Sequence, residues 1–225
     1  MQPVEIPWTV FFDCGNSGKA ICSLLVSVSL GQDRIRCFIA IPVDAGVLGI
    51  VRQLQSSLDD RLSSEIVQWT RPEQIHLTLK FFGNIPVSSV EDLSTALPQA
   101  CQGVGPFNLR LANLGCFPNS RSPRILWIGL AGNLGALMEL QSCVAQQMKA
   151  FSAHEDNHPF HPHLSIGRVK RAHQEMAGLL GKVMAEAGNP EPYEWTVGQV
   201  ELIRSVLGSH GSTYSNLAVV SLAHR

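Results

Sequence analysis

Apolar residues recur along the chain in two kinds of pattern. Two short runs rich in β-branched and aromatic residues, 35–41 and 125–130, are typical of buried strands. Each run is followed by a segment whose apolar positions stand three or four apart, which predicts a helix with one buried face. These positions are Val47, Ile50, Val51, Leu54 and Leu58 in the first segment and Leu137, Leu140, Val144 and Met148 in the second.

The predicted elements then continue in the same order in both parts of the chain: a strand that carries histidine, a helix, and another strand. They fall at 75–81, 90–100 and from 106 in the first part, and at 161–168, 175–187 and from 192 in the second. Corresponding positions stand 86 to 89 residues apart, which indicates an internal repeat. A further strand is predicted near residues 214–222, so we expect the two halves to exchange or share terminal strands.

This duplication predicts an α+β fold with pseudo-two-fold symmetry. In each unit the helices should cover one face of an antiparallel or mixed sheet, and the two uncovered faces should meet across a central groove. We predict a single bilobal domain over residues 35–225. Residues 1–34 match no part of the repeat, and they are expected to be either a disordered extension or the result of a mis-set start.

Two histidines occupy matching places in the repeat. On a strand, residues two apart share a face, so His76 and Thr78 should project together while the leucines between and after them pack under the helices. His163 and Ser165 have the same arrangement. A third histidine followed by serine, at His210, lacks the alternating apolar residues and predicts a turn. A lone histidine is usually a core or surface residue, and it is the duplication that favours a functional pair.

Two imidazoles and two hydroxyls directed at one groove suit acid–base chemistry on a phosphate. An unperturbed imidazole has a pKa of about 6.5, so near neutral pH one ring can accept a proton while the other donates one. Opening a cyclic phosphate needs a base for the attacking water and an acid for the departing oxygen. The hydroxyls of Thr78 and Ser165 can donate hydrogen bonds to the phosphate oxygens. Because no carboxylate or thiol lies within either motif, we expect no metal.

Charged side chains near the two motifs are candidates for substrate binding. Lys80 shares the strand parity of the first motif, and His161 shares that of the second. Arg168 falls on the opposite parity unless the strand bends at Gly167. For these three residues, a solvent-exposed charge at the end of a strand is an equally good interpretation.

Composition restricts the class of partner. The 225 residues carry a net charge of -1, with 45% hydrophobic and 16% charged residues, which is typical of a globular protein. Without a basic excess, charge alone gives weak affinity for long nucleic acids, which favours a small or end-directed substrate. The six cysteines form no C-x-x-C pair, and the apolar stretch 20–30 is too short to cross a bilayer and a poor signal peptide. We therefore expect reduced thiols, a cytoplasmic monomer and no membrane partner.

The residues around the two motifs resemble the 2H phosphoesterase superfamily. Within it they are most similar to the LigT-like RNA 2',3'-cyclic phosphodiesterases, historically called 2'-5' RNA ligases. The similarity spans roughly the last 190 residues, which is the size of one whole domain. It is carried by residues 35–42, 69–83, 117–118, 123–127, 159–168 and 205–207.

This resemblance implies conversion of a 2',3'-cyclic phosphate, on RNA or on a small cyclic nucleotide, to a 2'-phosphate without metal or cofactor. It further implies that His76 is the general acid and His163 the general base, with Arg124 among the substrate-binding residues. Ser165 stands where the family more often has threonine, and it keeps the hydroxyl. Two other functions remain open: nucleotide or RNA binding without turnover, and 2'-5' RNA ligation through the same groove.

Overall fold

The structure is a computed structural model that describes residues 34–62, 66–152, 159–170, 174–208 and 211–223. All of these residues lie in one compact unit, Gln32–Arg225. The predicted extension, residues 1–34, lies outside the described residues except for Arg34, which already belongs to the first strand. His210 also lies outside the described residues.

Strands and helices alternate along the described residues in an order that repeats. The first half contains β1 (Arg34–Pro42), α1 (Ala45–Asp59), β2 (Val67–Trp69), the short 3-10 helix η1 (Pro72–Gln74), β3 (His76–Pro86), α2 (Ser89–Ala100) and β4 (Phe107–Phe117). The second half contains β5 (Ile125–Gly132), α3 (Leu134–Gln147), η2 (Lys149–Phe151), β6 (His163–Val169), α4 (Gln174–Ala187), β7 (Glu194–Val197), β8 (Gln199–Gly208) and β9 (Gly211–Ser221). Polar side chains cap the corresponding helices α1 and α3: Asp44 accepts from the N–H of Val47, and Asn133 from that of Ala136.

The strands form two antiparallel sheets. We call the sheet with the order β3-β1-β8-β9 sheet A, and the sheet with the order β2-β6-β5-β4-β7 sheet B. In sheet A, β8 from the second half pairs with β1, and in sheet B, β4 from the first half pairs with β5. The predicted α+β fold with two duplicated sheets and exchanged strands is confirmed.

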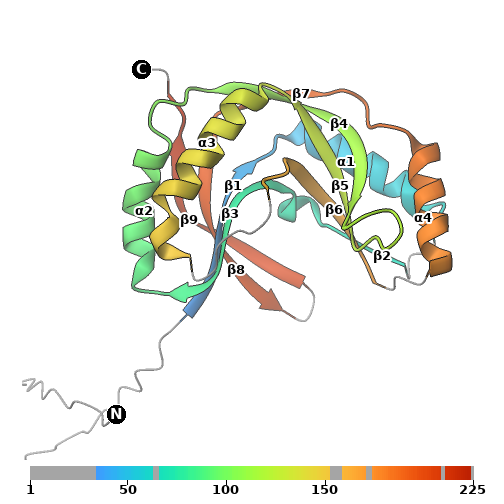
Figure 1. Cartoon of the computed structure of the whole chain (residues 1–225), viewed down its shortest axis with the longest axis horizontal. Helices are drawn as coiled ribbons and strands as arrows, with labels where there is room; N and C mark the ends of the chain where they lie inside the picture. The colour runs from blue at the N-terminus through green and yellow to red at the C-terminus, as the bar shows by residue number, and fades with distance from the viewer. Residues whose placement is uncertain (1–33, 63–65, 153–158, 171–173, 209–210, 224–225) are drawn as a thin grey trace, which may run out of the picture. The chain divides into compact units, whose positions relative to one another are not determined.

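Among the described residues, helices cover one face of each sheet. Helices α2 and α3 lie together over sheet A, and α1 and α4 lie together beside sheet B (Figure 1). Alternate residues of β1 distinguish the helix-covered side of sheet A from the opposite side. Cys37, Ile39 and Ile41 belong to the main hydrophobic core under the helices, whereas Phe38 and Ala40 belong to a separate small cluster on the opposite side. We call this side of sheet A, and the side of sheet B that faces away from α1 and α4, the helix-free face.

The strand predicted to open at residue 192 divides into two. Its first part, β7, is short and pairs with β4 at the edge of sheet B. After Gly198 the chain enters β8, which pairs with β1 in sheet A and so occupies the place that β4 has in sheet B. The sequence shows one extended run here, because the transfer between sheets depends on which strand each part pairs with.

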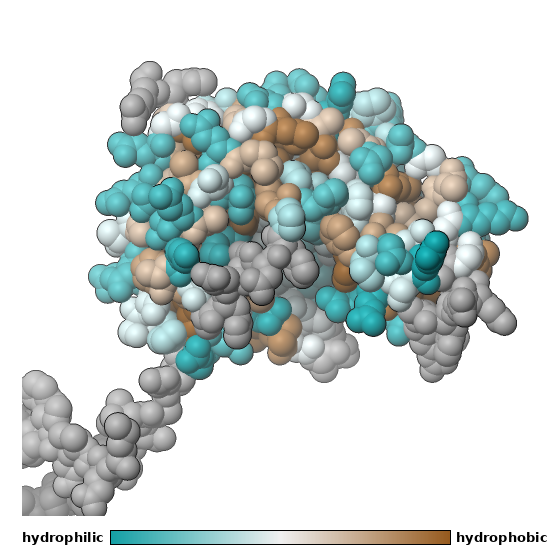
Figure 2. Space-filling view, viewed as in Figure 1, coloured by the Kyte–Doolittle hydropathy of each residue, from teal (hydrophilic) through white to brown (hydrophobic). Residues whose placement is uncertain are grey.

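Apolar side chains are dispersed over the face of the molecule that Figure 2 shows. On the face shown in Figure 2, hydrophobic residues form small groups between polar ones. Large hydrophobic residues that are exposed include Leu207, at 69%, and Phe81. Over the described ranges, no helix combines the length and the apolar character that crossing a membrane requires.

Candidate active site

The first motif lies on the helix-free face of sheet A. His76 begins β3, and its ring stacks on Phe38 with 4.6 Å between centroids and meets Tyr214 edge-on at 5.5 Å. Thr78 pairs with Ala40 of β1. Because directly opposite residues in an antiparallel sheet share a face, the Thr78 hydroxyl lies on the same side as Phe38 and the His76 ring.

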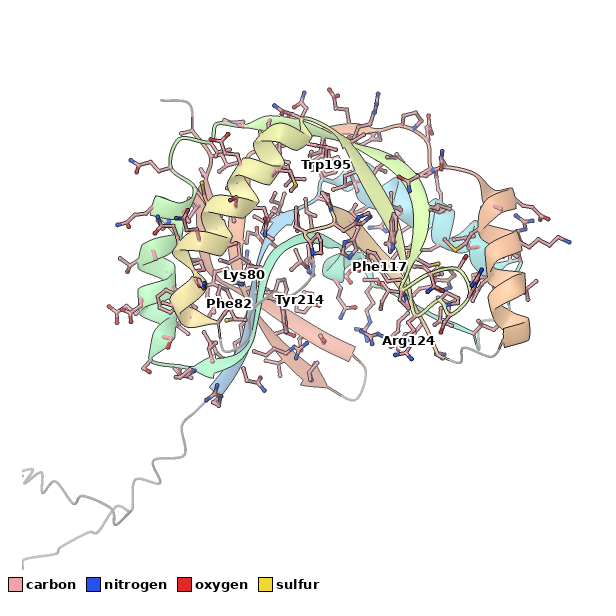
Figure 3. The ribbon with its side chains drawn as sticks, viewed as in Figure 1. Lys80, Phe82, Phe117, Arg124, Trp195 and Tyr214 are labelled. Atoms are coloured by element: carbon pink, nitrogen blue, oxygen red, sulfur yellow. The ribbon has the colours of Figure 1, made fainter. Side chains whose placement is uncertain are left out.

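The second motif lies on the helix-free face of sheet B. His163 begins β6, and its ring meets Phe117 edge-on at 5.0 Å and Trp127 at 6.3 Å. Ser165 pairs with Trp127, so its hydroxyl shares the face of that indole. Figure 3 shows Phe117 among the strands of sheet B and Tyr214 among those of sheet A.

The two histidines interact electrostatically although they stand in different sheets. Strands β3 and β6, which carry them, contact each other. The positive charge of a protonated His163 lowers the pKa of His76, which requires the two rings to be within electrostatic range. The fold therefore brings together the two motifs that the repeat predicted.

A backbone carbonyl orients each imidazole. The Nδ1 atom of His163 lies 2.6 Å from the carbonyl oxygen of His161. Because a carbonyl can only accept, Nδ1 carries the hydrogen in the neutral ring, and the lone pair is on Nε2. His76 makes a hydrogen bond to the backbone of Gln74, also two residues earlier, and this bond raises its pKa as a carbonyl acceptor would. Both histidines thus have the same local arrangement.

Burial lowers the pKa of both imidazoles and so favours their neutral forms. It lowers the pKa of His76 to about 4, with the bond to Gln74 opposing this shift and the charge of His163 adding to it. The pKa of His163 is lowered as well, mainly by burial, with the bond to His161 opposing and the charge of His161 adding. An anionic phosphate bound beside the rings would raise both pKa values, because negative charge favours the protonated form.

We expect the lowered pKa of His76 to make the folded protein less stable in acid. In the unfolded chain this histidine binds its proton below about pH 6.5, whereas in the folded protein it does so only near pH 4. Between these values the unfolded state binds more protons, so the free energy of unfolding falls as the pH falls. Urea denaturation between pH 4 and 7 should show a shallower pH dependence for His76→Asn than for the wild type. Parallel curves would contradict the assigned pKa.

Both motif strands contain a β-bulge at the third residue after the histidine. In β6, Ser165 pairs with Trp127 and Gly167 pairs with Leu126, so Ile166 is the extra residue. In β3, a register shift at the corresponding place makes Leu79 the extra residue. Residues beyond a bulge have their alternation reversed relative to a regular strand.

The bulge in β6 brings Arg168 onto the helix-free face. Arg168 pairs with Ile125, which lies two residues from Trp127 and therefore on the same side of the sheet. Its side chain is exposed. A regular strand would have placed Arg168 on the face opposite to Ser165. The irregularity that the sequence allowed at Gly167 is present as the bulge at the neighbouring Ile166.

The bulge in β3 has the converse effect on Lys80. Lys80 pairs with Ile39, a residue of the main core, and it is only 6% exposed. This places it toward the helix-covered face, which differs from the predicted position beside His76. The next residue, Phe81, pairs with Phe38 on the helix-free face instead. The guanidinium of Arg36 lies over its ring, 4.4 Å from the centroid.

Two other predicted residues lie close to the second motif. The exposed His161 ring is 4.9 Å from that of Trp127 and 5.4 Å from that of Phe117, and its carbonyl orients His163. Arg124 is exposed, and its backbone joins β4 to β6: its N–H donates to Phe117 over 2.7 Å and its carbonyl accepts from Val169 over 2.9 Å. Figure 3 shows Arg124 and Phe117 in the same part of sheet B.

The aromatic residues that enclose the histidines were not predicted as site residues. Phe38 lies in the continuous apolar stretch 37–41 and Trp127 in 125–130, and in such stretches the alternation between faces cannot be read from the sequence. Tyr214 belongs to a strand whose partner could not be known. The only local signal was the presence of a large aromatic residue at corresponding places in the two halves.

Gly115 is required by the packing of the site. A Cβ atom at this position would overlap the six-membered ring of Trp127, the indole that pairs with Ser165 and lies next to His163. We expect Gly115→Ala to lower the free energy of unfolding by about 1–3 kcal/mol, as overpacking usually does. Gly49→Ala is the matched control, since no atom lies within 4 Å of its added Cβ. Equal stability of both variants in urea denaturation would contradict this packing.

Comparison with known proteins identifies the family. Residues 46–208 match the model of the 2'-5' RNA ligase superfamily. An RNA 2',3'-cyclic phosphodiesterase of Methanothermobacter thermautotrophicus is 29% identical over 191 residues, covering 84% of this chain and all of the relative. A protein with the same name from Archaeoglobus fulgidus is 30% identical over 185 residues, covering 82% and 99%. The crystal structure of a Thermus thermophilus protein, TT0787, superposes with a TM-score of 0.70 at 23% identity, over 85% of this chain and all of that one. This chain belongs to the 2'-5' RNA ligase superfamily.

Proposed function

We propose that the protein hydrolyses 2',3'-cyclic phosphates at the ends of RNA or on small nucleotides, using His76 and His163 for proton transfer. The observation that carries this proposal is the pair of corresponding motifs on the helix-free faces, with rings close enough for their charges to interact. Two relatives named RNA 2',3'-cyclic phosphodiesterase that align with most of the chain support the choice of substrate.

In the proposed reaction, water attacks phosphorus and the bond from phosphorus to the 3' oxygen breaks. The free Nε2 of His163 removes a proton from the water, and His76, protonated in the complex, gives a proton to the departing 3' oxygen. The products are a 2'-phosphate and a 3'-hydroxyl. The hydroxyls of Thr78 and Ser165 donate to the non-bridging oxygens as negative charge grows there.

Three further side chains near the second motif are proposed to bind the substrate. Arg168 lies on the same face as Ser165, and a guanidinium suits both a phosphate and the face of a base. Arg124 is exposed and directly precedes Ile125, the residue that pairs with Arg168. His161 packs beside His163. We assign no substrate contact to Lys80, because it lies toward the helix-covered face.

The proposal is tested by incubating the purified protein with 2',3'-cyclic nucleotides and with a cyclic-ended oligoribonucleotide. Chromatography against 2'- and 3'-phosphate standards should show the 2'-phosphate. Absence of turnover with every substrate, combined with tight nucleotide binding, would favour a binding module. A 3'-phosphate product would contradict the proposed direction of ring opening.

The name of the matching family gives a specific reason to test 2'-5' RNA ligation as a second function. A 5'-hydroxyl can replace water as the nucleophile: His163 removes its proton, the bond from phosphorus to the 3' oxygen breaks, and His76 protonates that oxygen, which leaves a 2'-5' linkage. Incubation of cyclic-ended RNA with 5'-hydroxyl RNA, followed by digestion with a nuclease specific for 3'-5' linkages, separates the two outcomes.

We expect hydrolysis to continue after metals are removed, because the proposed proton transfers use only imidazoles. Among the described residues, no group of three or more histidine, cysteine or acidic side chains is placed to hold a metal ion. Activity measured after dialysis against EDTA should equal that of the untreated protein. Loss of activity that Mg²⁺ or Zn²⁺ restores would contradict a metal-independent mechanism.

We also propose that the protein acts as a monomer in the cytoplasm. Both motifs come from one chain, and the four cysteines in the described part of the chain, Cys37, Cys101, Cys116 and Cys143, carry free thiols. Light scattering of the purified protein and fractionation of cells test the two statements separately.

A further inference from the structure

A side chain of helix α1 holds the bulge of the second motif strand. The Nε2 atom of Gln55 donates to the carbonyl oxygens of Ile166 and Thr70, at 2.8 Å each. The N–H of Thr70 donates to the same Ile166 carbonyl at 3.0 Å. The carbonyl of the extra residue in the bulge thus accepts two hydrogen bonds, and Gln55 is only partly exposed.

A glutamine in the other half has the corresponding position. Gln141 of α3 directs its Nε2 toward the carbonyl of Leu79, the extra residue in β3, at the longer distance of 3.5 Å. Each of these helices follows a strand of one sheet in the chain and donates its hydrogen bond to the other sheet. Helix α1 follows β1 of sheet A but donates to sheet B, and α3 follows β5 of sheet B but donates to sheet A.

The bulge matters to the site because it determines which residues of β6 share a face. Ser165 precedes the extra residue and Arg168 follows it, and both lie on the helix-free face only while Ile166 remains unpaired in the register with β5. Without the Gln55 donor the Ile166 carbonyl loses one partner. The strand can then relax toward regular pairing, which would turn Arg168 away from the site.

We propose that Gln55 is a positioning residue that acts on the substrate through Ser165 and Arg168, and that Gln141 acts correspondingly through Thr78. Neither glutamine needs to touch the substrate. The inference rests on the proposed function for its kinetic test, but not for its structural test.

The kinetic test is a crossed pair of double-mutant cycles. Gln55→Met keeps the length of the side chain and removes the donor, and we expect it to lower kcat about 10-fold, as small misplacements of reacting groups do. In a background that carries both Ser165→Ala and Arg168→Ala, the same substitution should cost less than about 2-fold, because both groups that Gln55 positions are absent. In a Thr78→Ala background it should still cost about 10-fold. Single-turnover measurements with excess protein keep the slow variants measurable.

Matched variants separate positioning from general loss of stability. Gln55→Glu keeps the shape and replaces the donor with acceptors, so it should match Gln55→Met. Gln53→Met, at an exposed position of the same helix, should retain wild-type kcat. Gln141→Met should show the converse result: its effect on kcat should be small in a Thr78→Ala background and remain full in a background with Ser165→Ala and Arg168→Ala. Full additivity of Gln55→Met with the Ser165→Ala and Arg168→Ala pair, or wild-type kcat in Gln55→Met, would overturn the proposal.

The structural test needs no substrate. The amide of Thr70 bonds directly to the Ile166 carbonyl, so its hydrogen exchange reports on the bulge. Exchange at Thr70 should be at least about 10-fold faster in Gln55→Met than in the wild type, while amides of β3 remain unchanged. Unchanged exchange at Thr70 overturns the proposal. Absence of hydrolysis by the wild type together with faster exchange would count against the proposed function and leave the role of Gln55 in the bulge supported.

Discussion

Replacing either His76 or His163 with alanine is expected to lower kcat/KM for a 2',3'-cyclic nucleotide by about 10²- to 10⁴-fold, the usual contribution of one proton transfer. The two losses should not multiply in the double variant, because the acid and the base act in the same transition state. Initial rates with 2',3'-cyclic AMP measure all three variants. Circular dichroism should show an intact fold, since both histidines are partly exposed.

His161→Ala is the control for these substitutions. This ring packs against the same aromatic residues as His163 but makes no proposed proton transfer. Its orienting hydrogen bond to His163 comes from the backbone, which the substitution keeps. Because His161 is proposed to bind the substrate but not to transfer a proton, we expect a much smaller loss, which falls on KM rather than on kcat. Activity that survives both His76→Ala and His163→Ala would remove the proposed mechanism.

Removing the two hydroxyls is expected to give the second largest loss. Thr78→Val keeps the shape of the side chain, and Ser165→Ala keeps the backbone. Each should lower kcat about 10²- to 10³-fold, as the loss of one preorganised donor to a developing charge does. The effect should fall mainly on kcat rather than on KM, because the charge on the phosphate oxygens grows in the transition state.

Conservative variants distinguish a hydroxyl donor from mere packing. Thr78→Ser and Ser165→Thr keep the hydroxyl and should stay within about 10-fold of the wild type. Full activity of Thr78→Val would show that this hydroxyl makes no contact with the phosphate. Steady-state kinetics with one cyclic nucleotide suffices for all four variants.

Much of the fold was readable from the sequence because the chain is duplicated. The repeat predicted the two sheets, and the additional strand near residues 214–222 predicted the exchange of strands. Local alternation placed His76 and Thr78 on one face. The division of the last predicted strand into β7 and β8 was not readable. Extended residues look alike in a sequence whichever sheet they join.

The bulges explain why the charged residues were harder to predict than the histidines. Parity is a reliable guide only as far as the first extra residue, and His76 and Thr78 both precede Leu79. Lys80 follows it, so counting by two gave a position that differs from the one observed. A glycine inside a strand often marks a bulge, and in β6 Gly167 gave this signal. In β3 no glycine stands next to Lys80.

The exchange of β4 and β8 makes the two halves of the chain dependent on each other. In sheet A, β1 has β8 as its neighbour on one side, and β8 is made long after β1 during synthesis. Until then the nascent chain holds a strand with an open edge, which other chains could join. Neither half expressed alone should therefore give a well-folded lobe, whereas the two halves supplied together could reconstitute both sheets at once.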